Sequence, residues 1–173
     1  VCPGGAGLPH LLFQVWRPWG CGMRLVAVGR MKDKAELALV ERYLKRLRPR
    51  LEIVELADGR GNPEEIKRRE AQAILAAIPA QSCVIAPDLA GQAYDSMAFA
   101  PAMQGWVAAG RAPCFVIGGA EGLDATVLDR ADGAMSLGAM TWPHMLVRIM
   151  LVEQVYRAQA ILAGHPYHRA GRP

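Results

Sequence analysis

The segment HPYHR, residues 165–169, places two histidines, a tyrosine and an arginine within five positions near the end of the chain. Imidazole and phenol groups can move protons or contact a nucleobase, and a guanidinium can hold a phosphate. A bound metal is disfavoured, because no cysteine or carboxylate stands at ligand spacing from these histidines. A solvated chain end is the ordinary alternative for such a segment.

The stretch CFVIGGAEGLD, residues 114–124, ends an apolar run in two glycines and adds a third after an isolated acid, Glu121. The spacing is not G-x-G-x-x-G, and no Gly-Lys-Ser/Thr follows, so it matches neither a dinucleotide fingerprint nor a P-loop. Two interpretations remain: a tight turn from strand to helix, or a turn whose backbone approaches a ligand closely, which glycine permits. Glu121 would either stabilise the first turn of the next helix or lie at the mouth of a site.

The stretch SLGAMTWPHMLVRIMLVEQVYRA, residues 136–158, runs from a strand-like segment into a long helix that is apolar on nearly every side. Such a helix must be buried on more than one side, so we expect a second subunit to cover part of it. Arg148 interrupts the apolar run. Its side chain either lies along the surface with the guanidinium in water or contacts a substrate phosphate.

Strand-like and helix-like segments alternate from Met23 onward and would position these residues. Continuously apolar strands that alternate with helices are typical of a parallel sheet with helices on both faces. Ligands of such sheets bind outside the carboxyl ends of the strands, where the glycine turn would lie. The predicted strands are residues 24–29, 51–57, 82–88, 114–119 and 134–140. The predicted helices are residues 35–47, 63–78, 96–109, 124–131 and 143–163.

The chain has 173 residues, of which 52% are hydrophobic, and this fits one domain with a full core. A net charge of +4 and a pI near 9.1 are mildly basic. The basic ends flank an acidic middle, which suits a polyanion held at the edges of a site, although solvated helix faces explain the N-terminal charges equally well. No apolar run is long enough to span a bilayer, and four cysteines without a CxxC pair favour a reducing, cytoplasmic compartment. Residues 1–22, rich in Gly and Pro, are expected to be an irregular extension or a non-native remnant ahead of one domain at residues 23–173.

The ordered set VIGGAEGL, LGAMTWPHMLVRIMLVEQVYRA and HPYHR resembles the RlmH family of SPOUT methyltransferases. The resemblance runs from Met23 to the C-terminal tail and also includes LVAVG and the DxxG at residues 88–91. It implies methylation of N3 of a pseudouridine in the 23S ribosomal RNA of the assembled ribosome. S-adenosylmethionine would be the methyl donor and S-adenosylhomocysteine the product. The resemblance further implies a homodimer formed through the C-terminal helix, and a sheet whose C-terminal segment is threaded into a deep trefoil knot, the α/β knot of SPOUT proteins.

The resemblance assigns the cofactor to three loops, held largely through main-chain atoms. Methyl transfer requires the acceptor nitrogen to be positioned in line with the methyl group, and the N3 proton must leave. His168 is the best candidate for a base, Tyr167 would stack on or hydrogen-bond to the nucleobase, and Arg148 completes the catalytic set. The RNA contacts are expected from His144, Arg148 and Arg169, with both arginines on phosphate. The residues expected to bind the cofactor are Pro87, Gly119, Leu137, Gly138, Ala139, Met140, Thr141 and Trp142.

The chain departs from the family pattern in three places: Pro87-Asp88 replaces Leu-Asp, Gly138 replaces a serine, and Asp95-Ser96 replaces Ser-Glu. Contact with the cofactor through main-chain atoms would tolerate these changes. Two alternatives stay open: a non-catalytic SPOUT-like dimer that binds the ribosome, and a SPOUT methyltransferase that acts on tRNA. A Rossmann-type oxidoreductase shares the alternating pattern but requires the G-x-G-x-x-G fingerprint, which is missing here.

Overall fold

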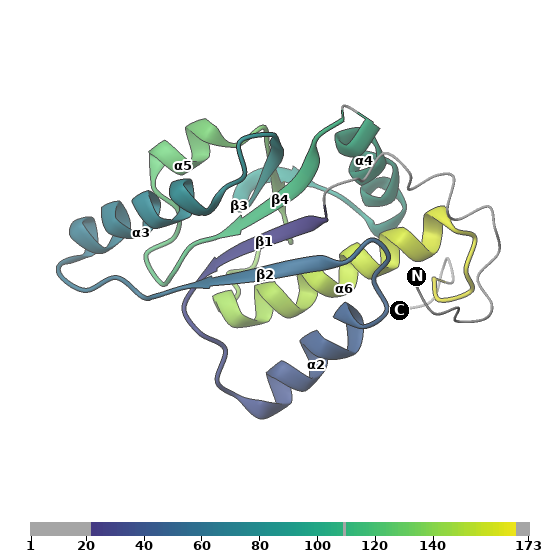
Figure 1. Ribbon diagram of the computed structural model, residues 1–173, viewed down its shortest axis with the longest axis horizontal. Coiled ribbons are helices and arrows are strands. Elements are labelled where there is room, and N and C mark those ends of the chain that lie inside the picture. Colours follow the sequence, from purple (N-terminus) through teal and green to yellow (C-terminus); the bar gives the residue numbers. More distant parts are fainter. Residues whose placement is uncertain (1–21, 109, 169–173) are drawn as a thin grey trace, which may run out of the picture.

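The computed structural model describes residues 22–108 and 110–168, and within them five strands alternate with five helices (Figure 1). This order confirms the alternation predicted from the sequence. In chain order the elements are β1 (Met23–Val28), α2 (Lys34–Leu44), β2 (Leu51–Leu56), α3 (Pro63–Ala77), β3 (Ser82–Ala93), α4 (Ser96–Ala108), β4 (Ala112–Ile117), α5 (Ala125–Arg130), β5 (Gly133–Ser136) and α6 (His144–Leu162).

The five strands form one sheet in the order β2-β1-β4-β3-β5, and every neighbouring pair is parallel. This confirms the parallel sheet expected from the apolar strands. Because parallel strands point the same way, the segments that follow β1, β4 and β5 leave the sheet at one edge. The glycine turn follows β4 and the predicted cofactor loop at residues 137–142 follows β5, so both lie at this edge.

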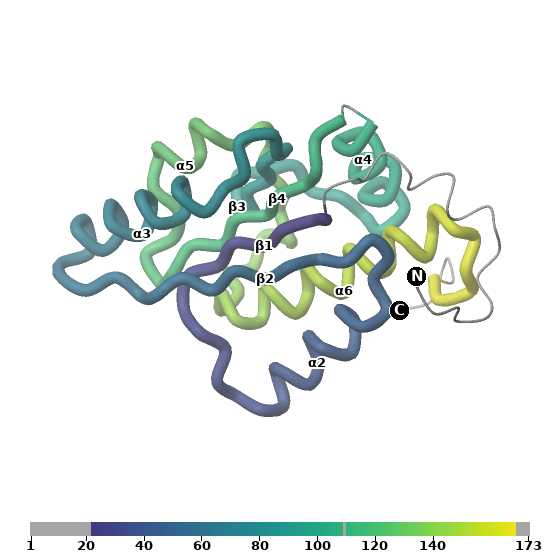
Figure 2. Tube along the Cα trace, viewed as in Figure 1, coloured from purple at the N-terminus to yellow at the C-terminus, as the bar shows by residue number. Residues whose placement is uncertain are grey.

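Helices cover both faces of the sheet, as Figures 1 and 2 show. Alternate residues of β1 face opposite sides, which is the period of a strand. Leu25 and Ala27 belong to the core shared with α2, α4 and α6. Val26 and Val28 belong to the core shared with α3 and α5. The long α6 therefore lies in a layer with α2 and α4, with its buried face against the sheet.

Two helix starts are fixed by polar side chains that the sequence indicated. The Oδ1 atom of Asn62 accepts a hydrogen bond from the Glu65 backbone N–H at 2.9 Å, and Pro63 occupies the first helical position of α3. The Oδ1 atom of Asp124 accepts one from the Thr126 N–H at 2.9 Å and begins α5. The cap at Asp124 therefore marks where the glycine turn ends and the helix begins.

Strand β5 is shorter than predicted, ending at Ser136 rather than at residue 140. The hydroxyl of Ser136 donates to the Gly138 carbonyl at 3.1 Å and accepts from the Gly138 N–H at 3.2 Å. The backbone of Gly138 has a φ of +109°, which is outside the extended region. This local turn ends the strand and releases residues 137–143 as a loop.

Strand β3 is longer than predicted and continues to Ala93. Its pairing with β5 shifts register between Pro87 and Gln92, so an irregular segment lies in its middle. A side chain at Gly91 would lie 2.5 Å from the Met135 backbone nitrogen, which explains the glycine. The irregular segment brings Pro87 and its neighbours to the same edge as the loop after β5.

Two expectations stay predictions. The described coordinates establish the parallel α/β sheet, whereas the threading of the C-terminal segment into a knot is an implication of the family resemblance. The proposed irregular extension at residues 1–22 lies outside the described residues, except for Gly22, which directly precedes β1.

Candidate functional site

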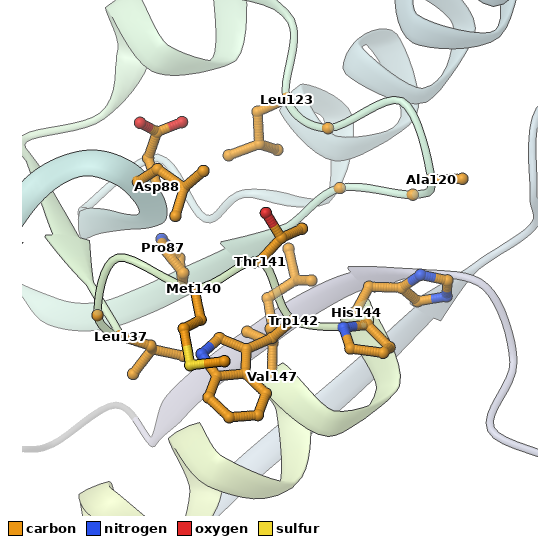
Figure 3. Close-up of a pocket in the computed structure, with 17 residues that line it drawn as sticks. Pro87, Asp88, Ala120, Leu123, Leu137, Met140, Thr141, Trp142, His144 and Val147 are labelled. Carbon is orange, nitrogen blue, oxygen red and sulfur yellow. The ribbon is translucent and has the colours of Figure 1, made fainter.

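A cavity of about 660 Å³ opens at the carboxyl edge of the sheet (Figure 3). Three chain segments build it: residues 87–89 in the irregular part of β3, residues 117–123 at and after the end of β4, and residues 137–147, which include the first turn of α6. Its volume is in the range of sites that hold a small molecule or a cofactor. The sequence placed a ligand at this edge, and the structure has a cavity there.

Seven of the eight residues predicted to bind a cofactor line this cavity, and Ala139 is in the same loop without lining it. They come from segments far apart in the sequence, which the sheet brings together. His144, predicted to contact RNA, lines the cavity as well. The seven residues are Pro87, Gly119, Leu137, Gly138, Met140, Thr141 and Trp142.

The wall of the cavity is largely apolar, and several apolar side chains at its rim face solvent. Met140 is 69% exposed, Leu89 61% and Trp142 38%. In Figure 3, Leu137, Met140 and Trp142 lie together on one side of the cavity, and Leu123 lies opposite. Exposed apolar side chains around a hollow are typical of a surface that receives a ligand or a partner.

The glycine turn forms one wall and is closely packed. The Gly122 N–H donates to the Gly119 carbonyl at 3.1 Å, and Gly122 has a φ of +75°. A Cβ atom at Gly118 would lie 2.7 Å from the Gly122 carbonyl oxygen. Glu121 is exposed in this turn and does not line the cavity, and Asp124 instead caps the next helix. The turn is thus a compact backbone feature that presents main-chain atoms to the cavity.

Arg148 does not lie where either interpretation of the sequence put it. Its side chain is 1% exposed, and its guanidinium donates to the backbone carbonyls of Val28 and Gly29 and to the Glu55 carboxylate. Desolvation lowers the pKa of Arg148, and the nearby carboxylates oppose this effect. Contact with a substrate phosphate would require these bonds to break, so the structure assigns Arg148 to joining α6 to the end of β1.

This arginine also helps to place the start of α6 beside the cavity. Glu55, which receives the Arg148 guanidinium at 3.1 Å, accepts the Met31 N–H at 2.9 Å with the same oxygen. Gly29 has a φ of +89°, and the His144 Nε2 atom would lie 3.4 Å from a Cβ at this position. The polar contacts of one buried side chain therefore fix the end of β1 against the first turn of α6.

The described part of the C-terminal tail, residues 165–168, folds back on α6 and does not line the cavity of its own chain. The Tyr167 hydroxyl donates to Glu153 Oε1 at 2.9 Å, and the Arg157 guanidinium binds the same oxygen. Burial, together with hydrogen bonds to Tyr43 and Glu153, raises the pKa of Tyr167 well above its ordinary value. The phenol is therefore a hydrogen-bond donor at neutral pH. Arg169 lies outside the described residues.

His168 has a defined orientation. Its Nδ1 atom lies 3.4 Å from an Arg157 guanidinium nitrogen. Because a guanidinium only donates, Nδ1 is the acceptor, and the proton of the neutral ring is on Nε2. Nε2 is buried without a hydrogen-bond partner in the described part of the chain. In this arrangement the imidazole presents an N–H donor rather than a base.

A second cavity, of about 640 Å³, lies between α2, α4 and α6 and was not anticipated from the sequence. It shares Leu137 and Gly138 with the first cavity, so the loop after β5 separates the two. Its wall includes Ile149 and Met150 of α6, together with Glu153, the acid that receives Tyr167. The apolar pattern of α6 predicted an apolar surface here. It did not predict that α2 and α4 would line the same cavity.

Within residues 22–108 and 110–168 there is no group of three or more His, Cys, Asp or Glu side chains that could hold a metal ion. No helix in that part of the chain is long and apolar enough to cross a membrane. Cys83 and Cys114 are buried free thiols.

The family profile described as "Predicted SPOUT methyltransferase" matches residues 22–168. Similar curated proteins carry the name ribosomal RNA large subunit methyltransferase H. The protein of Gluconacetobacter diazotrophicus is 60% identical over 151 residues, which cover 87% of this chain and 99% of that protein. Those of Acidiphilium cryptum and Rhodospirillum centenum are 56% and 50% identical and cover 89% and 84% of this chain and 98% and 97% of their own lengths. With a matching profile over most of its length and relatives of this identity, the chain belongs to the RlmH family of SPOUT methyltransferases.

Proposed function

We propose that this protein transfers a methyl group from S-adenosylmethionine to N3 of a pseudouridine in the large-subunit ribosomal RNA. The observation that carries the proposal is the cavity at the carboxyl edge of the sheet, which three family-specific loops build together. The names of the relatives, ribosomal RNA large subunit methyltransferase H, support the large-subunit RNA as the substrate. The choice of a pseudouridine, and of the assembled ribosome in the cytoplasm, rests on the family resemblance.

The residues of the cavity fit the proposed cofactor. Apolar side chains such as Leu137 and Trp142 suit the adenine ring, and the glycine turn offers main-chain polar atoms. Pro87, Gly119 and the loop 137–142 would hold it, and S-adenosylmethionine would supply the methyl group from its sulfonium centre. Pro87 and Gly138, the departures from the family pattern that line this cavity, are compatible with main-chain binding.

The chain's own residues would then orient the acceptor, and the N3 proton would pass to bulk water as the bond from N3 to the methyl group forms. A negative charge develops on the carbonyl oxygens beside N3 as the proton leaves, and fixed donors stabilise such a charge. The Nε2–H of His168 has no hydrogen-bond partner in the described part of the chain, which favours this role over the role of a base. His144 lines the cavity and would contact the RNA beside it. The tail would also supply Arg169 to a phosphate.

The proposed active site needs two copies of the chain. Tyr167 and His168 do not line the cavity of their own chain, so we propose that a partner's tail completes each site. The surface offered for the homodimer is the outer side of α6, where Leu146 is 39% exposed, and the adjoining second cavity. Light scattering on purified protein tests this assembly, since a monomer at micromolar concentration would contradict it.

The test of function is methyl transfer from labelled S-adenosylmethionine to whole ribosomes that lack the modification. We expect label in the large-subunit RNA, in a nucleoside that mass spectrometry identifies as N3-methylpseudouridine. Mixing two inactive variants, one altered in the cavity at Gly118 and one lacking residues 165–173, should restore part of the activity if sites are shared. Label in tRNA would indicate the tRNA alternative, and ribosome binding without cofactor binding would indicate the non-catalytic one.

A further inference from the structure

Glu70 is a buried carboxylate that lies behind the cavity rather than in it. It is on α3, and only 5% of its surface is exposed. Its Oε1 atom accepts the Gly59 backbone N–H at 3.0 Å. A carboxylate is rarely buried to this extent unless its oxygens have a role. One oxygen therefore has a structural role, which is to hold the loop after β2 against α3.

The other oxygen of Glu70 faces the glycine turn. Its Oε2 atom is buried and has no hydrogen-bond partner in the described part of the chain. A Cβ atom placed on Gly119 would lie 2.8 Å from Oε2 and 2.9 Å from Oε1. Both distances are shorter than real Cβ contacts, so the carboxylate packs directly against the Cα atom of Gly119.

The reason why position 119 requires glycine therefore differs from the reason that applies to Gly122. The Gly119 backbone is not in the left-handed region, whereas Gly122 has a φ of +75°. A side chain at Gly119 would point at Glu70 and not into the cavity that Gly119 lines. The close approach that the structure shows at this position is to the glutamate, while an approach of the Gly119 backbone to a ligand stays a prediction.

We infer that Glu70 is a positioning residue that holds the glycine turn in place and thereby sets the shape of the cofactor wall. It contacts Gly59 on one side and Gly119 on the other, and so couples the loops after β2 and β4. The inference rests on the proposed function only in naming S-adenosylmethionine as the ligand whose affinity depends on the position of the turn.

The test is a double-mutant cycle in the full chain with two readouts. The variants are Glu70→Gln, Glu70→Ala, Gly119→Ala, and Gly119→Ala combined with each. Calorimetry gives the affinity for S-adenosylmethionine, and hydrogen exchange without cofactor gives the protection of the amides at residues 118–123. Glu64→Gln, an exposed acid on the same helix, and Gly105→Ala, with no atom near its Cβ position, are the matched controls.

We expect Glu70→Gln, which keeps the size and the acceptor, to stay within threefold of wild type in affinity. Glu70→Ala should weaken binding at least tenfold and speed exchange at residues 118–123 at least tenfold. Gly119→Ala should weaken binding at least tenfold in wild type and with Glu70→Gln. In the Glu70→Ala background, Gly119→Ala should weaken the affinity for S-adenosylmethionine no more than twofold, because the space for the alanine side chain is then open. Both controls should match wild type.

The inference would be overturned if the losses of affinity from Glu70→Ala and Gly119→Ala were additive. It would also be overturned if hydrogen exchange at residues 118–123 were unchanged in Glu70→Ala. Should Glu70→Ala not fold, Glu70→Asp replaces it, since its carboxylate is one methylene shorter and withdraws from Gly119. A wild-type protein that binds no S-adenosylmethionine would instead contradict the proposed function. The exchange measurement then still decides whether Glu70 positions the turn.

Discussion

Replacement of Arg148 by methionine should destabilise the protein without removing an RNA contact. Methionine keeps most of the length and the apolar stem but removes every donor. Val28 and Gly29 then lose a donor to their carbonyl groups, and Glu55 loses its cation. Because the guanidinium is buried, the change acts on folding and on the position of α6.

The expected loss of stability follows from these contacts. Removing one partner of a fully buried ion pair costs about 3–5 kcal/mol. Glu55 is 30% exposed in its side chain and regains water, which reduces the loss. The two carbonyls, once unpaired, cost about 1–3 kcal/mol each unless water reaches them. With the lower part of each range, because water reaches Glu55, we expect a decrease of about 3–6 kcal/mol in the free energy of unfolding. For a chain of this size the midpoint of thermal unfolding should fall by roughly 6–24 °C.

Urea unfolding measures the role of Arg148 in stability, and ribosome binding at several salt concentrations measures whether Arg148 contacts an RNA phosphate. Arg148→Met should shift the urea midpoint and leave the salt dependence of binding unchanged. Arg148→Lys, which keeps the charge with fewer directed donors, should fall between methionine and wild type in stability. Arg42→Met, on the exposed side of α2, is the control and should be neutral. A stable Arg148→Met protein with a weaker salt dependence of binding, as expected for one lost phosphate contact, would refute the reasoning.

Three further results are expected. Burial raises the pKa of Asp132, but the hydrogen bond from the Val84 N–H and the guanidinium groups of Arg111 and Arg130 outweigh burial, so the pKa is lowered overall. The ionised carboxylate of Asp132 therefore stabilises the fold above about pH 4, and this stabilisation is lost as the pH falls through the lowered pKa. Asp132→Asn should therefore cost about 1–2 kcal/mol at pH 7 in denaturant unfolding, with a difference from wild type that shrinks at pH 3. Burial raises the pKa of Cys114 to about 11 and also raises that of Cys83, so peptide mass spectrometry should find both unalkylated by iodoacetamide at pH 8 until the protein is unfolded. Tyr167→Phe should cost about 1 kcal/mol of stability and should lower the rate of methyl transfer more than the affinity for S-adenosylmethionine.

The sequence predicted the elements well because their signals are local. Asn62 and Pro63 begin α3 as expected, and the apolar runs become strands of a parallel sheet. The end of β5 could not be predicted in this way, since Met135 through Met140 is apolar enough to continue a strand. What ends it is the hydrogen bonding between Ser136 and Gly138, a contact that an apolar pattern does not contain.

The residues that line the cavity were predicted from family-specific motifs, whereas those that support it were not. Glu70 stands in a helix rich in charged residues, and nothing in its neighbourhood distinguishes it from the exposed Glu64. Its role depends on Gly59 and Gly119, each in another loop, so only the fold brings the three together. Supporting residues of this kind are not visible to motif analysis.

The burial of Arg148 could have been inferred from its spacing on α6. Leu151, Val152 and Val155 follow it at three, four and seven positions, and all of them are buried, so Arg148 stands on the same stripe of the helix. An arginine on that stripe must find acceptors inside the protein, because an unpaired buried charge is costly. The backbone carbonyls at the end of a parallel strand, beside an acid of the next strand, meet this need. The single charge in the apolar run therefore fixes the position of α6 along the sheet, which the surrounding leucines and valines would not do, because apolar contacts are not directional.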